Sequence, residues 1–174
     1  MKKIIILLLV LILSTFSGCR YIAYKDYYDN ISDYNDIWDL TGFRHGYETQ
    51  SPLFPESVEN LDVKTFFCRY DQQLPLGEGV QLHIEISYDE TALEDEIQRI
   101  SNLASLNEKN FNSEKFTAYD IRLGKDGCWE YALIDSNDKT IHYIFLYDVP
   151  KKAIELENDL IPDNYVDYTQ EEQK

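Results

Sequence analysis

The chain has 174 residues, a formal net charge of -16, 44% hydrophobic residues and 14% aromatic residues. The aromatic content argues against a disordered acidic tail, because such a chain can bury enough apolar surface to offset the entropy lost on ordering. The excess of 32 Asp and Glu over 16 Lys and Arg argues against nucleic-acid binding, which depends on basic side chains that contact phosphates. The length predicts a single domain.

The N-terminal segment has the pattern of a secretory signal peptide. Met1, Lys2 and Lys3 form a short basic start, and an apolar run follows from Ile4 to Leu13. This run is too short to span a bilayer, which needs ~20 apolar residues. A basic start followed by an apolar stretch of this length is typical of a cleaved signal.

The residues after this run are Phe16, Ser17, Gly18 and Cys19. Small residues just before a Cys resemble the lipobox of bacterial lipoproteins, and the chain is similar to small uncharacterised members of that group; Phe16 stands where Leu is usual. The resemblance implies removal of residues 1–18, a diacylglyceryl group on Cys19, a short tether over 19–24, and location on the extracytoplasmic face of the cell membrane. The alternatives are a secreted protein cleaved nearby and an uncleaved anchor.

Two acyl chains are enough for stable membrane residence, whereas one is marginal. Cleavage would also remove Lys2 and Lys3 and leave 14 basic residues against 32 acidic ones, a net charge of -18. We therefore expect the mature domain to be repelled by an anionic membrane surface, to which only the lipid on Cys19 would hold it.

Two further cysteines, Cys68 and Cys128, lie in strand-like segments. Disulfides persist outside the cytoplasm, so these two residues can form one. The alternative, two separate buried thiols, is favoured because a domain of this size does not need the cross-link. Neither Cys has a CxxC partner or a His at metal-binding spacing, so no metal site is predicted.

Residues 20–42 are rich in Tyr and Asp. Tyr24, Tyr27 or Tyr28, Ile31, Tyr34 and Trp38 recur at three- and four-residue spacing, which predicts an amphipathic helix. Its aromatic stripe either packs on the domain itself or forms a surface for a partner, and packing is the commoner role of such stripes. Residues 43–60 read as a loop.

The rest of the chain alternates between strand patterns and one further helix. The helix begins at Thr91 as N-cap, with Glu94 completing a capping box. The expected strands are Val63–Tyr70, Val80–Tyr88, Thr117–Leu123, Trp129–Ile134 and Ile141–Tyr147. The fold class is therefore α+β: a mainly antiparallel five-stranded sheet packed with helices, in the order α-β-β-α-β-β-β.

Details within this scheme are also testable. Asp71–Gly79 is expected to be a turn, and Gly127 to adopt the left-handed conformation in the next hairpin. That hairpin should pair Leu123 with Trp129, Ile121 with Tyr131 and Tyr119 with Leu133, all on one face. Ile141–Tyr147 is apolar on both faces, which predicts a central strand. The single domain should span 25–162, with 150–162 a short helix or extended, and a flexible polar tail over 163–174.

No motif for chemistry stands out. The three histidines, His45, His83 and His142, have no nearby Ser or Cys in a GxSxG turn. Cys128 and His142 should face opposite sides of the sheet, whereas Cys68 and His83 can be neighbours across a hairpin. Asp135–Asp138 begins like a calcium loop but lacks its Gly and distal Glu. No catalytic residue, metal or cofactor is predicted.

The acidic, tyrosine-rich composition instead suits protein recognition, because Tyr supplies rigid amphipathic contact area. The predicted function is a non-catalytic, lipid-anchored module that binds a protein partner. The alternatives are a receptor for a small ligand or cation and, third, a small hydrolase.

Overall fold

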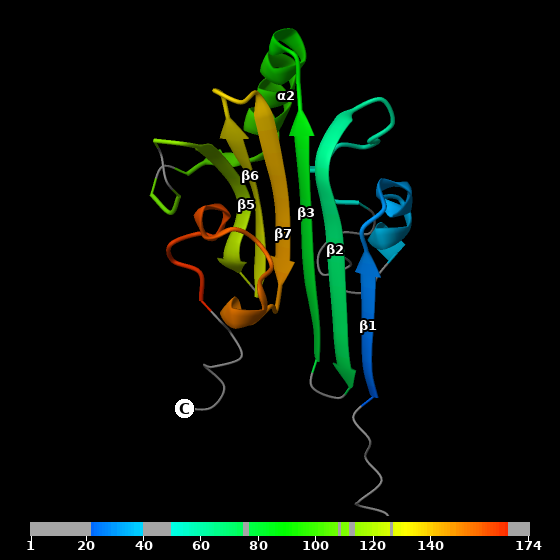
Figure 1. Ribbon diagram of the computed structural model, residues 1–174. Helices are drawn as coiled ribbons and strands as arrows, with labels where there is room; N and C mark the ends of the chain where they lie inside the picture. Colours follow the sequence, from blue (N-terminus) through cyan, green and yellow to red (C-terminus); the bar gives the residue numbers. More distant parts are fainter. Residues whose placement is uncertain are drawn as a thin grey trace, which may run out of the picture.

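The computed structural model describes residues 22–39, 50–74, 77–107, 109–111, 114–125 and 127–166 (Figure 1). They form one seven-stranded antiparallel sheet in the order β1-β2-β3-β7-β6-β5-β4. The strands are β1 (Ile22–Tyr28), β2 (Asp62–Leu74), β3 (Gly77–Ser87), β4 (Ser105–Leu106), β5 (Thr117–Lys125), β6 (Cys128–Asp135) and β7 (Thr140–Tyr147). Within the described ranges one α-helix, α2 (Glu90–Leu103), accompanies four short 3-10 helices: η1 (Ile31–Asp33), η2 (Asp36–Asp39), η4 (Lys151–Ala153) and η5 (Asn158–Leu160).

The expected α+β class, with an N-terminal helix and a five-stranded sheet packed with helices, is wrong. All five expected strands are present, but β1 and β4 extend the sheet at its two edges. The N-terminal segment forms β1 followed by η1 and η2. Residues four apart share a face in a strand as well as in a helix, so the Tyr24–Tyr28 spacing fits either structure. β1 starts at Ile22, inside the segment expected to be a tether.

The first face of the sheet carries the larger part of the core. Leu82, Ile84 and Ile86 of β3 are fully buried there. Tyr34 and Trp38, from the predicted aromatic stripe, pack against this face. Ile37 of η2, Leu53 and Phe54 of the expected loop, and Leu93 and Ile100 of α2 complete this part of the core. The helix predicted at the N-terminus is absent, but its aromatic residues are largely core.

The second face is covered by the C-terminal segment. Tyr131, Leu133 and Ile144 are buried beneath Leu156 and Leu160, and the Tyr131 hydroxyl donates to the Leu160 carbonyl at 2.8 Å. Tyr165, expected in the flexible tail, is only 7% exposed and donates to the carbonyl of Val149 at 2.5 Å. The packed domain therefore continues past residue 162.

The middle of the sheet follows the sequence pattern closely. β7 occupies the central position, and most of its side chains are buried on both faces, as its apolar run predicts. The β2–β3 hairpin is longer than expected, because both strands continue through most of Asp71–Gly79. Gly79 lies within β3, where a Cβ atom would come within 3.2 Å of the Asp148 carbonyl oxygen. Its small size permits this close approach.

The β5–β6 hairpin confirms part of the predicted register. Leu123 pairs with Trp129, and Gly127 has a φ of 74° as expected. A bulge between Asp120 and Arg122 then shifts the strands, so that Tyr131 pairs with Asp120. The predicted pairs Ile121–Tyr131 and Tyr119–Leu133 are therefore wrong, and Tyr119 and Ile121 pack on the first face.

The cap of α2 also differs from the prediction. Asp89 is the N-cap and accepts a hydrogen bond from the backbone N–H of Ala92 at 2.9 Å. Thr91 lies inside the first turn. Asp is as good an N-cap as Thr and stands where the chain is still extended after β3, so the helix begins two residues earlier.

Candidate functional site

The predicted site residues are widely separated. Cys19 lies outside the described residues, as does His45. Cys68 and Cys128 are buried free thiols on β2 and β6. β3 and β7 lie between those strands, which puts the two backbones about 14 Å apart at the ordinary strand spacing. A disulfide needs Cα atoms within about 7 Å, so the Cys68–Cys128 bridge does not fit this fold.

The structure brings together two histidines that the sequence analysis treated separately. His83 of β3 and His142 of β7 stack with ring centroids 5.4 Å apart, and His83 Nε2 lies 3.1 Å from His142 Nδ1. His83 pairs across the ladder with Ile144, and His142 with Glu85, so the two rings are diagonal neighbours on the second face. Cys68 pairs with Leu82 and faces the opposite side from His83. Cys128 likewise faces away from His142, as predicted.

The histidine pair is neutral in the folded protein. A hydrogen bond between two ring nitrogens requires one donor and one acceptor. Burial, with a smaller effect from His142, lowers the pKa of His83 to about 3. Burial also lowers the pKa of His142. Within the described residues neither ring has a second hydrogen-bond partner, so each imidazole is held by the other.

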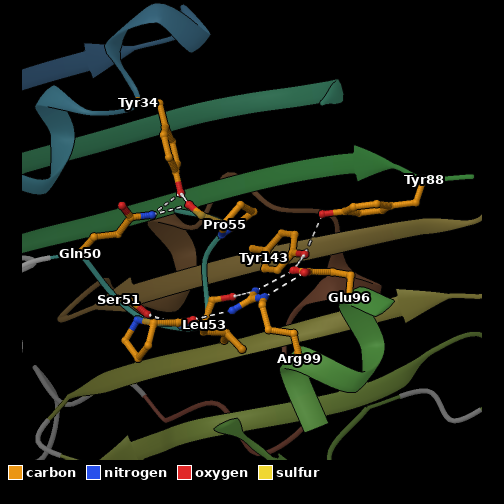
Figure 2. A network of polar contacts seen from close by, with 10 residues as sticks. Tyr34, Gln50, Ser51, Leu53, Pro55, Tyr88, Glu96, Arg99 and Tyr143 are labelled. Carbon is orange, nitrogen blue, oxygen red and sulfur yellow. Dashed lines mark hydrogen bonds and ion pairs between the residues drawn. The ribbon is translucent and has the colours of Figure 1, made fainter. Parts of the chain in front are cut away.

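A second cluster of polar side chains joins α2 to the first face of the sheet (Figure 2). Arg99 forms a bidentate ion pair with Glu96, at 2.6 and 2.8 Å, and donates to the carbonyls of Pro52 and Leu53 at 2.7 and 2.6 Å. The hydroxyl of Tyr143 on β7 donates to Glu96 at 2.5 Å. Arg99 thereby holds the segment around Leu53 against the helix.

The same network extends along the sheet. The hydroxyls of Tyr88 and Tyr143 lie 2.9 Å apart. Burial raises the pKa of both phenols, so both remain protonated and able to donate. Near the segment around Leu53, the Tyr34 hydroxyl donates to the carbonyl of Pro55, and the Gln50 side chain donates to the Tyr34 hydroxyl at 2.6 Å. These contacts satisfy groups that burial would otherwise leave unpaired, which indicates a structural role.

Glu130 of β6 is a fully buried carboxylate on this first face. It accepts a hydrogen bond from Ser51, and Arg122 Nε lies 4.0 Å from its other oxygen. Ser51 in turn accepts from the backbone N–H of Leu53 at 3.1 Å. The carboxylate is thus used to seat the segment around Leu53 and is closed off from solvent.

On the second face, β1 and β2 carry a surface that is partly exposed to solvent. Tyr27 pairs with Arg69, and Lys25 with Asp71. Directly paired residues share a face, so these four and Phe67 form one surface, here called the β1–β2 surface. Tyr27 is 58% exposed. Its ring centroid lies 4.9 Å from the guanidinium of Arg69, which is 5.0 Å from the ring of Phe67 on its other side.

Arg69 is fixed in this position. It forms ion pairs with Asp29, at 2.5 Å, and with Glu155 of the C-terminal segment, at 3.1 Å. Gln81 anchors that segment: its side chain donates to the Ala153 carbonyl at 3.1 Å and accepts from the Glu155 N–H at 2.9 Å. The result is a rigid stack of Phe67, Arg69 and Tyr27 whose outermost ring faces solvent.

The sequence analysis missed this surface. Tyr27 alternates with Tyr28, which packs on the first face, and the alternation would have separated the two had the segment been read as a strand. The calcium-like start at Asp135 is a turn, in which the Asp135 carboxylate accepts from the backbone N–H groups of Asn137 and Asp138. No group of three metal-binding side chains occurs in the part of the chain that the structure describes.

Comparisons with known proteins give no assignment: no family model, curated protein or solved structure matches the chain. Of the helices in the described residues, none has the length and apolar character needed to cross a membrane.

Proposed function

We propose that the protein is a non-catalytic module, anchored by lipid at Cys19 on the extracytoplasmic face of the cell membrane, that binds a protein partner through the β1–β2 surface. The observation that carries this proposal is the stack of Phe67, Arg69 and exposed Tyr27. Tyr and Arg are the residues that most often supply the binding energy of protein interfaces.

Rigidity makes the stack well suited to this role. The ion pairs to Asp29 and Glu155 hold Arg69, so little side-chain entropy is lost when a partner contacts Tyr27. Most aromatic residues whose side chains the structure describes are buried, whereas Tyr27 is 58% exposed. The partner proposed is a basic protein, because the net charge of -18 that remains after removal of residues 1–18 would accelerate encounter with a positively charged surface.

The lipid anchor is supported by the basic start, the apolar run and the Gly18–Cys19 pair of the sequence. Its test is membrane fractionation with a palmitate analogue in the growth medium. The parent chain should label and sediment with membranes, and Cys19→Ser should do neither. Labelling that survives the substitution would contradict the anchor.

The binding surface is tested by affinity capture of crosslinked complexes from membranes. Tyr27→Ala should remove a partner that the parent chain retains. The matched control is Leu106→Ala at the opposite edge of the sheet, where Leu106 is 53% exposed. Equal retention by both variants would refute the β1–β2 surface as the binding site, even if the anchor at Cys19 is established.

A further inference from the structure

The two ends of the sheet differ in charge. Because the strands are antiparallel, β1, β3 and β6 begin at the same end, where β2, β5 and β7 finish (Figure 1, lower end). We call this the tether end, since Ile22 is the first residue of β1 and follows Cys19 by three positions. Three residues of fully extended chain span at most about 11 Å. A lipid on Cys19 would therefore keep the start of β1 within roughly that distance of the membrane.

Three exposed lysines lie on the β5–β7 side of the tether end, where the ladder aligns Lys125 with Asp26, four residues along β1 from Ile22. Lys125 is the last residue of β5, and Lys151 and Lys152 form η4, which follows β7. The turn that carries η4 is fixed there by a hydrogen bond from the Asp148 N–H to the Gly127 carbonyl at 3.1 Å. In the described part of the chain no carboxylate lies within ion-pair distance of these three lysines.

Two of the described carboxylates near the tether end are engaged within the fold. Asp71 pairs with Lys25 at 2.7 Å, and Glu78 accepts from the Tyr70 hydroxyl at 2.8 Å. Asp148 lies in the turn before η4. The charges of the three lysines are thus directed to solvent on the β5–β7 side of the sheet, where Lys125 is five strand spacings, about 24 Å, from β1.

The opposite end, here called the distal end, is strongly acidic. Three lysines near this end are paired, Lys64 with Asp62 at 2.6 Å, Lys139 with Glu90 at 3.5 Å, and Lys115, two residues before β5, with Asp159 at 2.6 Å. The described carboxylates of this end are Glu59, Asp62, Asp89, Glu90, Glu94, Asp95, Asp135 and Asp138. An anionic surface attracts the lysines of the tether end and repels the distal end, so the charge distribution sets an orientation.

We propose that Lys125, Lys151 and Lys152 dock on anionic lipid headgroups of the membrane that holds Cys19, so that the sheet leans toward its β5–β7 side and the acidic end points outward. This inference rests on the proposed lipid anchor. Net charge alone predicts repulsion of the whole domain; the separation of charges along the strands confines that repulsion to the distal end. The β1–β2 surface would then face sideways, toward partners beside the protein on the membrane.

The test uses the lipidated protein reconstituted in vesicles that contain a lipid with a quencher on its headgroup. A fluorophore is attached at Ala153→Cys, next to the lysines, or at Thr91→Cys on the distal end; the buried Cys68 and Cys128 do not compete for the dye. In vesicles of phosphatidylglycerol and phosphatidylcholine, the dye at position 153 should be quenched severalfold more than the dye at 91.

The lysines are then replaced together in K125Q/K151Q/K152Q. Each lysine near an anionic surface changes the docked-to-undocked ratio about fivefold, so the triple variant should lower this ratio about 100-fold. Its quenching at 153 should fall to the level seen in pure phosphatidylcholine. The matched control K64Q/K139Q, at the distal end, should leave quenching unchanged.

Two failures are distinguishable. A protein that associates with neither kind of vesicle overturns the lipid anchor and, with it, the docking. A protein that is anchored but shows equal quenching at 91 and 153, or quenching at 153 that is insensitive to the three lysines, overturns the docking alone.

Discussion

Lowering the pH should destabilise the fold through His83. Its pKa is about 3 in the folded protein and about 6.5 in the unfolded chain, so the unfolded state binds more protons between these values. The stabilisation is complete above pH 6.5 and is lost as the pH falls from there toward 3. At pH 5, 1.5 pH units below the unfolded value, the loss is about 2 kcal/mol.

The assay is urea unfolding of the parent chain and of His83→Gln at pH 7.5 and pH 5. Gln keeps a polar group beside His142 but does not titrate. Both proteins retain His142 and the carboxylates, so these groups largely cancel in the comparison. The parent chain should lose about 2 kcal/mol more than the variant over this range. Equal losses would refute the assignment of a buried neutral His83.

Three further predictions concern the packing. Arg99→Gln should lower the free energy of unfolding by about 2–3 kcal/mol, because Glu96 loses its ion pair and keeps only the Tyr143 donor, while the carbonyls of Pro52 and Leu53 lose the guanidinium. Lys64→Gln, which removes an exposed ion pair, should cost less than about 1 kcal/mol in the same urea titration. Gly127→Ala should cost about 1–2 kcal/mol, since φ is 74° there, and an unchanged midpoint would contradict that turn. Cys68 and Cys128 are buried free thiols, and burial raises the pKa of Cys68 to about 12. Both should therefore react with a thiol reagent only after the protein is unfolded in urea without reductant. If neither thiol reacts after unfolding, the two cysteines form a disulfide.

The regular strands could be predicted because their side chains alternate cleanly. β3 alternates Val80, Leu82, Ile84 and Ile86 with polar residues, and the apolar set is fully buried. β7 is apolar on both faces and lies at the centre of the sheet. In both cases one physical requirement, burial of one or both faces, determines the residue pattern.

β1 could not be predicted because its residue spacing is ambiguous. The spacing of Tyr24 and Tyr28 fits one face of a helix or of a strand, and only pairing with the long β2 decides between them. The bulge between Asp120 and Arg122 leaves no comparable mark in the sequence, yet it moves Tyr119 and Ile121 to the other face. Local patterns do not encode such irregularities in the ladder.

The candidate sites depend on strand order, which hairpin patterns do not supply. His83 and His142 meet because β3 pairs with β7, although α2 and three strands separate them in the chain. The Phe67–Arg69–Tyr27 stack similarly requires β1 to lie beside β2. Tyr165 was assigned to the tail because its neighbours are polar, whereas its ring packs on Trp129 at a centroid distance of 4.8 Å.

The most direct test of the account is in-cell photo-crosslinking from position 27. A photoreactive phenylalanine derivative in place of Tyr27 should give a discrete adduct with one protein in the membrane fraction, and the same group in place of Leu106 should not. No adduct from position 27, or the same adducts from both positions, would contradict the proposal that this protein binds its partner through the β1–β2 surface.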